Sequence, residues 1–217
     1  MVKVKICGIR SLEDVDIINH YLPDYIGFVF AKSKRQVTPE FAAVLSKRLD
    51  ASIKKVGVFV NQPIEMLADL LVNGTLDYLQ LHGDEGQDYE HALFELLRKK
   101  GISNPEEHCI KAFRIKEEKD FKNVGQTGCS LLLLDAFSAS APGGTGESFN
   151  WNLIQSMEKP FFLAGGIHAG NVRQAIEQVN PYAVDLSSSL ETEGKKDEEK
   201  IKIFMETIRN TRRERYE

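Results

Sequence analysis

Short apolar runs alternate with longer amphipathic segments along the whole chain. The runs are rich in Val, Ile, Leu and Phe, as in parallel strands that are buried on both faces. They predict eight strands, at Val2–Cys7, Tyr25–Phe30, Val56–Val60, Leu76–Leu81, Cys109–Phe113, Leu131–Leu134, Phe161–Ala164 and Ala183–Leu186.

The segments between these runs carry apolar residues at helical spacing. Ser11 begins a capping-box-like start, and Thr38 with Pro39 gives an N-cap followed by proline at the first helical position. Apolar stripes predict further helices, at Ile64–Leu71, Tyr89–Leu97, Val172–Val179 and Ile201–Ile208, with a weak one around Glu117–Val124 and a short one near Asn150–Met157.

Alternating strands and helices imply a parallel sheet. Eight units within 217 residues predict an α/β fold, a single-domain (β/α)8 TIM barrel over residues 1–217. A doubly wound open sheet is the second possibility. It usually carries G-x-G-x-x-G after its first strand, and Cys7-Gly8-Ile9-Arg10 does not match that fingerprint.

Composition narrows the possible partners. The net charge is −4 and the pI is near 5.8, which argues against nucleic acid as the main partner. Three cysteines without C-x-x-C spacing predict neither a disulfide framework nor a zinc site. The start at Met1 leaves no room for a signal peptide, and no apolar run reaches membrane-spanning length. We therefore expect a cytoplasmic protein without a membrane partner.

Asp135 follows the four leucines Leu131–Leu134 and precedes a loop of small residues that ends near Gly146. In a (β/α)8 barrel the chemistry lies where the strands end, at their C-terminal side. A carboxyl group half enclosed by apolar residues is suited to donate a proton. An Asp that only caps the next turn is the alternative. Cys7 ends the first strand, far around the ring, so the pair could flank a ligand as base and acid.

Other strand ends carry binding chemistry. Gly165-Gly166 and Ser187-Ser188 follow the seventh and eighth strands, where barrels often hold phosphate through backbone N–H groups. A plain tight turn is the alternative for the glycines. Arg35 suits a carboxylate, or it belongs to a solvated basic loop. His82 could carry a proton or pack the loop, and it lacks partners at metal-ligand spacing.

Together these segments resemble the phosphoribosylanthranilate isomerase family of tryptophan biosynthesis. The matching segments run in order along nearly the whole chain: Lys5–Ile9, Gly27–Phe30, Ser33–Arg35, Val56–Asn61, Gln80–Gly83, Leu134–Asp135, Gly143–Gly146, Leu163–Gly166 and Val184–Ser188.

The resemblance implies an Amadori rearrangement of N-(5-phosphoribosyl)anthranilate to 1-(2-carboxyphenylamino)-1-deoxyribulose 5-phosphate. It implies Asp135 as general acid and Cys7 as general base, without a metal or organic cofactor. The substrate-binding residues would be Arg35, His82 and Asp185. The phosphate-binding residues would be Gly144, Gly146, Gly165, Gly166, Ser187 and Ser188.

Two segments depart from the family pattern. Ser189 stands where a Gly is usual, which would cost about 1 kcal/mol if that position needs a positive φ. His168–Asn171 replaces a Pro-containing helix start, and we expect Asn171 or the Gly170 backbone to cap instead.

Three other functions share parts of this pattern. A phosphosugar isomerase of histidine biosynthesis, or a dual-substrate relative, would have an Asp in place of Cys7. An indoleglycerol-phosphate synthase would need a catalytic Lys–Glu set and a longer N-terminal segment. A non-catalytic phosphate-binding barrel would not need both Cys7 and Asp135. The chain itself leaves monomer and homodimer open.

Overall fold

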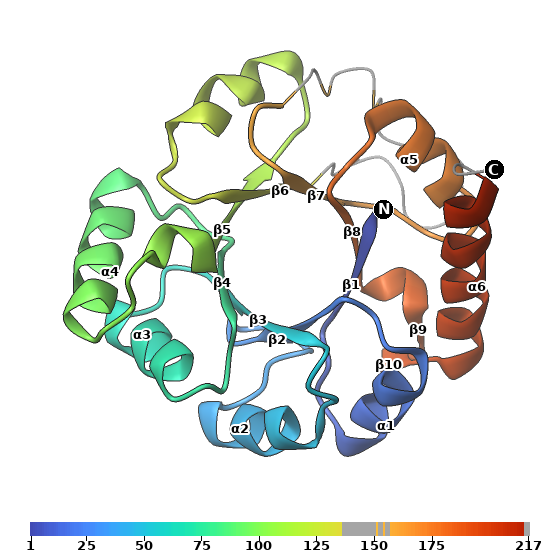
Figure 1. The fold of residues 1–217 in the computed structure, drawn as a ribbon, viewed down its shortest axis with the longest axis horizontal. Coiled ribbons are helices and arrows are strands. Elements are labelled where there is room, and N and C mark those ends of the chain that lie inside the picture. The colour runs from blue at the N-terminus through green and yellow to red at the C-terminus, as the bar shows by residue number, and fades with distance from the viewer. Residues whose placement is uncertain (136–150, 152–153, 155–156, 215–217) are drawn as a thin grey trace.

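The computed structural model describes residues 1–135, 151, 154 and 157–214. Its parallel strands close into one barrel in the order β1-β2-β3-β4-β5-β6-β7-β8, with β8 pairing back to β1 (Figure 1). The (β/α)8 prediction is confirmed and the open sheet is excluded. The strands are β1 (Lys3–Cys7), β2 (Tyr25–Val29), β3 (Lys54–Phe59), β4 (Tyr78–Leu81), β5 (Cys109–Arg114), β6 (Leu131–Asp135), β7 (Phe161–Ala164) and β8 (Ala183–Leu186).

The helices form a ring outside the barrel (Figure 1). They are α1 (Leu12–Tyr21), α2 (Pro39–Arg48), α3 (Ile64–Val72), α4 (Gln87–Lys99), α5 (Val172–Val179) and α6 (Glu198–Glu214). Ser11 and Asp14 form the expected reciprocal capping box, and the Thr38 hydroxyl accepts from the Phe41 N–H at 3.2 Å. None of the helices in the described part of the chain has the length and apolar character of a membrane span.

Some predicted elements differ in type or in their bounds, and one lies mostly outside the described residues. The weak helix near Glu117–Val124 is a 3₁₀ helix, Glu118–Gln126. β4 begins at Tyr78, two residues later than predicted, and the Asp77 carboxylate just before it accepts the Lys55 backbone N–H at 2.8 Å. The short helix expected near Asn150–Met157 lies mostly outside the described residues. Of that segment, the Trp151 side chain is described and is buried.

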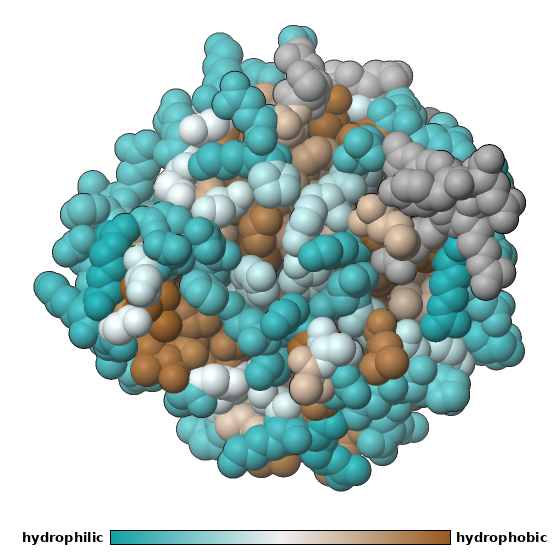
Figure 2. Space-filling view, viewed as in Figure 1, coloured by the Kyte–Doolittle hydropathy of each residue, from teal (hydrophilic) through white to brown (hydrophobic). Residues whose placement is uncertain are grey.

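The barrel has two apolar layers. Residues such as Ile6 and Phe28 point outward and pack against the helices, whereas Tyr25, Ile110 and Phe162 fill the interior. Figure 2 shows hydrophilic residues over much of the outer ring, with hydrophobic residues at its lower left and a mixture of both kinds in the middle. Since side chains alternate along a strand, Lys3, Lys5 and Cys7 share the inward face of β1.

The N-terminal end of the barrel is closed by aromatic rings. The Lys3 ammonium donates to the Tyr182 hydroxyl at 2.8 Å, and the hydroxyls of Tyr25 and Tyr182 lie 2.9 Å apart. Phe162 packs edge-on against both tyrosine rings. Lys3, Tyr25 and Tyr182 therefore satisfy one another at this end. The opposite end, where the strands finish, we call the C-terminal face.

Candidate active site

The predicted acid–base residues both lie at strand ends on the C-terminal face. Cys7 is the last residue of β1 and Asp135 the last of β6. The two strands are not neighbours, because β7 and β8 lie between them on the shorter way around the ring. His82 follows β4, and its Nε2 lies 3.5 Å from Oδ2 of Asp135. A thiol and a carboxyl group therefore approach the face from different strands, with an imidazole beside the carboxyl.

A buried ion pair lies among these groups. Lys5 is fully buried, and its Nζ lies 3.0 Å from Oδ2 of Asp185. Burial raises the pKa of Asp185 despite Lys5, and the nearby Asp135 raises it further. Burial alone would lower the pKa of Lys5, but the charges of Asp185 and Cys7 outweigh burial and raise it. Sequence reasoning missed Lys5. Its inward position could have been predicted from the alternation of Lys3, Lys5 and Cys7 with apolar residues.

Asp185 keeps one acceptor unused within the described residues. Its Oδ1 is buried and makes no hydrogen bond to any of them. A buried carboxylate oxygen without a donor is costly unless a ligand supplies one. A ligand hydroxyl at the C-terminal face would meet this need, in agreement with the predicted contact between Asp185 and the substrate.

The surroundings of Cys7 favour its neutral thiol over the thiolate. Burial raises the pKa of its thiol, Lys5 opposes this effect, and Asp185 adds to it. Because the pKa of the thiol is raised, the neutral thiol dominates at neutral pH, and the thiolate is a strong base once formed. Gly27 on β2 leaves room for the sulfur, since a Cβ there would lie 2.7 Å from Cys7 Sγ.

His82 is oriented by residues that sequence reasoning missed. The Gln80 amide nitrogen lies 2.7 Å from His82 Nδ1, on the ring side opposite Asp135. The following loop is held by Glu85, whose carboxylate accepts the backbone N–H groups of Asn61 at 2.7 Å and Gly83 at 2.8 Å. Lys111 from β5 donates to Glu85 at 2.9 Å and to the Gly83 carbonyl at 3.0 Å. Both side chains of this ion pair are buried.

Arg35 packs against the first and last strand ends. A Cβ on Gly8, which has a φ of +87°, would lie 2.5 Å from Arg35 Cδ and 3.3 Å from Ser187 Oγ. The guanidinium donates to both oxygens of Glu191, from Nε at 2.6 Å and from Nη2 at 2.7 Å. Burial would raise the pKa of Glu191, but Arg35 and Lys196 lower it to about 2. The solvated-loop alternative for Arg35 is thereby excluded.

The backbone of the glycine loop after β7, predicted to bind phosphate, adopts a conformation that favours glycine. Gly165 and Gly166 have φ values of +87° and +70°, which favour glycine. Asn171 occupies the N-cap position of α5 without capping it. Its amide instead donates to the Gly166 carbonyl at 2.9 Å and accepts from the His168 N–H, which fixes the glycine loop.

The eighth-strand loop also lacks the strain that the sequence had suggested. Ser187 precedes the 3₁₀ helix Ser188–Leu190, and Ser189 is not among the described residues with a positive φ. The conditional cost of a serine at this position therefore does not apply. Gly144 and Gly146 lie outside the described residues.

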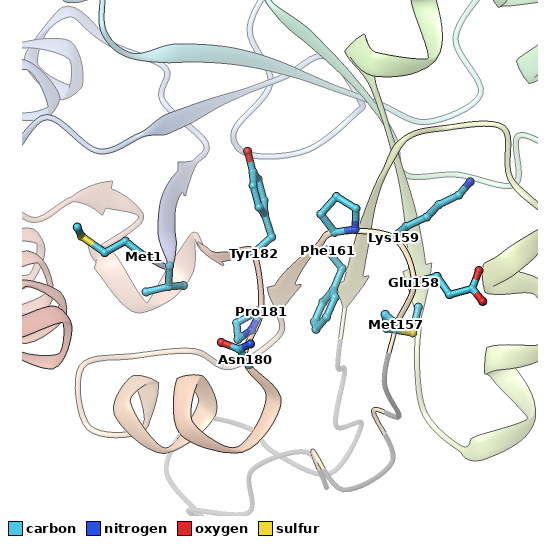
Figure 3. A pocket seen from close by; sticks show the side chains of 10 residues that line it. Met1, Met157, Glu158, Lys159, Phe161, Asn180, Pro181 and Tyr182 are labelled. Atoms are coloured by element: carbon cyan, nitrogen blue, oxygen red, sulfur yellow. The ribbon is translucent and has the colours of Figure 1, made fainter. Parts of the chain in front are cut away.

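A pocket of about 710 Å³ lies at the other end of the barrel. It is lined by the starts of β1, β7 and β8, with Met1, Phe161, Asn180 and Tyr182 around it (Figure 3). None of the predicted site residues lines it. The pocket is therefore separate from the acid–base groups.

The fold defines a (β/α)8 barrel, and the predicted site residues Cys7 and Asp135 stand at its strand ends. The model of the family described as N-(5'phosphoribosyl)anthranilate (PRA) isomerase matches residues 4–207. The chain belongs to this family, and it is an enzyme of the isomerase class. The resemblance inferred from the motifs is confirmed.

Individual relatives agree with this assignment. The chain is 46% identical over 215 residues to the N-(5'-phosphoribosyl)anthranilate isomerase of Thermoanaerobacter pseudethanolicus, covering 98% of this chain and all of the relative. The Clostridium acetobutylicum isomerase is 46% identical over 213 residues, covering 96% of this chain and 98% of the relative. The solved phosphoribosyl anthranilate isomerase of Thermotoga maritima superposes with a TM-score of 0.81 at 36% identity, over 97% of this chain and all of that one.

Two further solved structures bear on ligands and assembly. A phosphoribosyl anthranilate isomerase in complex with reduced 1-(o-carboxyphenylamino)-1-deoxyribulose 5-phosphate has a TM-score of 0.79 at 35% identity, over 97% of this chain and all of that one. Another structure contains monomers generated from the dimeric Thermotoga maritima enzyme, with a TM-score of 0.72 at 35% identity, over 96% of this chain and 99% of that one.

Proposed function

We propose that this chain catalyses the Amadori rearrangement of N-(5'-phosphoribosyl)anthranilate in tryptophan biosynthesis, with a small molecule as its only substrate and no cofactor. Asp135 protonates the furanose ring oxygen, and the C1–O bond breaks to give an open-chain iminium ion. The iminium acidifies the C2 proton, which the Cys7 thiolate removes. The resulting enolamine tautomerises to the ketone, 1-(2-carboxyphenylamino)-1-deoxyribulose 5-phosphate.

The observation that carries the proposal is the position of Cys7 and Asp135 at the ends of two separate strands on the C-terminal face. The proposed reaction needs an acid at the ring oxygen and a base at C2, two substrate atoms that are not bonded to each other. A thiol on β1 and a carboxyl group on β6 meet this requirement. His82 lies beside Asp135 and is suited to hold it or to return its proton.

The remaining groups have binding roles in this proposal. Arg35 binds the anthranilate carboxylate, and the unused Oδ1 of Asp185 accepts a ribose hydroxyl. Backbone N–H groups at Gly165-Gly166 and Ser187-Ser188 bind the phosphate. Gly144 and Gly146 are assigned to the phosphate from the sequence alone.

Steady-state kinetics test the catalytic roles. Cys7→Ala and Asp135→Asn should each lower kcat by at least ~100-fold, the usual contribution of an acid–base group, with an unchanged thermal midpoint. Arg35→Ala should chiefly raise KM. Asp84→Asn, an exposed carboxylate on the same face, serves as the control and should behave like the wild type. Near-normal turnover of either catalytic variant would refute the role of that residue.

The pH dependence gives a second test. Since the pKa of the Cys7 thiol lies above its ordinary value, kcat/KM should keep rising between about pH 7 and 9, as more thiolate forms in the free enzyme. A profile that is flat over this range would show that Cys7 is not the base.

A further inference from the structure

A small hairpin follows the eighth strand and carries two buried charges. Its strands are β9 (Glu191–Thr192) and β10 (Lys195–Lys196), which Figure 1 shows between α1 and α6. The two central turn residues, Glu193 and Gly194, both have positive φ values, 51° and 78°, as in a type I′ turn. This register makes Glu191 and Lys196 direct cross-strand partners. Lys196 Nζ lies 3.0 Å from Glu191 Oε1, and their side chains are only 1% and 5% exposed.

The Glu191 carboxylate holds one edge of the Arg35 guanidinium. It accepts from Nε at 2.6 Å and from Nη2 at 2.7 Å. A guanidinium has a second edge, formed by Nη1 and the other Nη2 proton, that can bind a second carboxylate in the same bidentate way. Nη1 of Arg35 makes no hydrogen bond to any residue that the structure describes.

Two other contacts fix the hairpin to the site. Arg10 donates from Nη2 to the Gly194 carbonyl at 2.7 Å and from Nη1 to the Lys34 carbonyl, so it ties the hairpin to the loop of Arg35. Lys196 also donates to the Ser187 carbonyl at 3.1 Å, next to the predicted phosphate loop. The cluster of Arg35, Glu191 and Lys196 has a net charge of +1, which suits an anionic ligand.

We infer that Glu191 and Lys196 are a positioning pair that holds the Arg35 guanidinium so that its Nη1–Nη2 edge receives the carboxylate of the substrate. The inference rests on the proposed function, because the carboxylate is that of the anthranilate ring. It assigns the hairpin to substrate recognition and goes beyond the acid–base residues and Arg35 itself. Neither residue of the pair needs to touch the substrate.

A double variant separates orientation from charge. Glu191→Gln/Lys196→Met removes one charge of each sign, so the cluster keeps its net charge of +1 on Arg35. Buried pairs that are removed together are often tolerated. The kcat/KM values are compared for two substrates prepared from ribose 5-phosphate, one with anthranilate and one with aniline, which lacks the carboxylate. The wild type should prefer the anthranilate substrate.

The double variant should lose about tenfold or more of this preference, while its kcat/KM for the aniline substrate stays within about threefold of the wild type. Glu193→Gln, an exposed glutamate two residues along the same hairpin, is the matched control and should keep the preference. A folded double variant with an unchanged or larger preference would overturn the inference and leave the proposed function intact. A wild type that turns over neither substrate would refute both.

Glu191→Asp provides the same test if the double variant does not fold. It keeps the charge, but its carboxylate is one methylene shorter and should not reach both guanidinium nitrogens. The preference should then lie between those of the wild type and Arg35→Ala. A folded Glu191→Asp with the full preference would likewise overturn the positioning role.

Discussion

Replacing Glu85 with Gln should destabilise the protein far more than a typical substitution of a surface carboxylate. The Glu85 side chain is fully buried, and its two oxygens accept two backbone N–H groups and the Lys111 ammonium. Gln has only one oxygen. If that oxygen serves Gly83 and Lys111, the amide group faces the Asn61 N–H and leaves this donor unpaired.

The magnitude follows from these contacts. An unsatisfied buried donor costs about 1–3 kcal/mol, and breaking a buried ion pair from one side costs about 3–5 kcal/mol. The two effects overlap at one side chain, so we expect a loss of about 4 kcal/mol in the free energy of unfolding and a fall of roughly 10 °C in the thermal midpoint. The loop that carries His82 should loosen as well, which lowers kcat.

The stability that Glu85 contributes should fall as the pH is lowered. Burial would raise the pKa of Glu85, but the hydrogen bonds from Lys111 and from the Asn61 backbone outweigh burial and lower it. A lowered carboxyl pKa contributes stability above the pKa of the unfolded chain, and this contribution is lost as the pH falls toward the folded value. The difference in the free energy of unfolding between the wild type and Glu85→Gln should therefore become smaller below about pH 4.

Urea unfolding at pH 7 measures this loss, with Asp84→Asn as the matched control on the neighbouring, exposed carboxylate. The control should stay within about 0.5 kcal/mol of the wild type. Glu85→Gln/Lys111→Met should cost at least ~1 kcal/mol less than the sum of the single variants, because the two residues form one pair. A cost below about 1 kcal/mol for Glu85→Gln would refute this account of the buried network.

Two further predictions follow from the site. Gly8→Ala places a Cβ at a φ of +87° and 2.5 Å from Arg35 Cδ. Urea unfolding should therefore show a loss of about 2 kcal/mol in the free energy of unfolding, and KM should rise. Gly86→Ala, with open space around it, should do neither. Glu191 has a pKa of about 2 in the folded protein, against 4.5 ordinarily, so about 3 kcal/mol of stability should be lost between about pH 5 and 2. Urea unfolding of Glu191→Gln should lack this component, and an equal loss in both proteins would contradict it.

The hydrophobic pattern was sufficient for the fold because the eight barrel strands are mostly buried on both faces. Leu131–Leu134 is distinguishable as a buried strand without any knowledge of its neighbours, and the barrel rule then places Asp135 at the C-terminal face. The same reasoning places Gly165-Gly166 after the seventh strand, where both residues adopt a backbone that favours glycine; their contact with phosphate stays a prediction. These predictions depend only on local sequence and on the order of the elements.

The ion pairs could not be predicted in this way. Lys5 and Asp185 are 180 positions apart, and Arg35 and Glu191 are 156 apart. The closure of β8 on β1 brings Lys5 to Asp185, and a hairpin with a two-residue turn positions Glu191 for Arg35. The spacing of hydrophobic residues encodes neither of these. Lys5 alone left a signal, as a lysine in phase with Cys7 on a strand whose other face is apolar.

Three buried lysine–carboxylate pairs surround the active site, and each supports a different functional group. Lys5 with Asp185 lies beside Cys7, Lys111 with Glu85 holds the loop of His82, and Lys196 with Glu191 holds Arg35. Removing a lysine and a carboxylate from water costs about as much as their attraction returns, so such pairs are a poor way to stabilise a core. Their concentration at one end of the barrel is therefore best explained by the site, where charged groups must keep fixed positions before the substrate arrives.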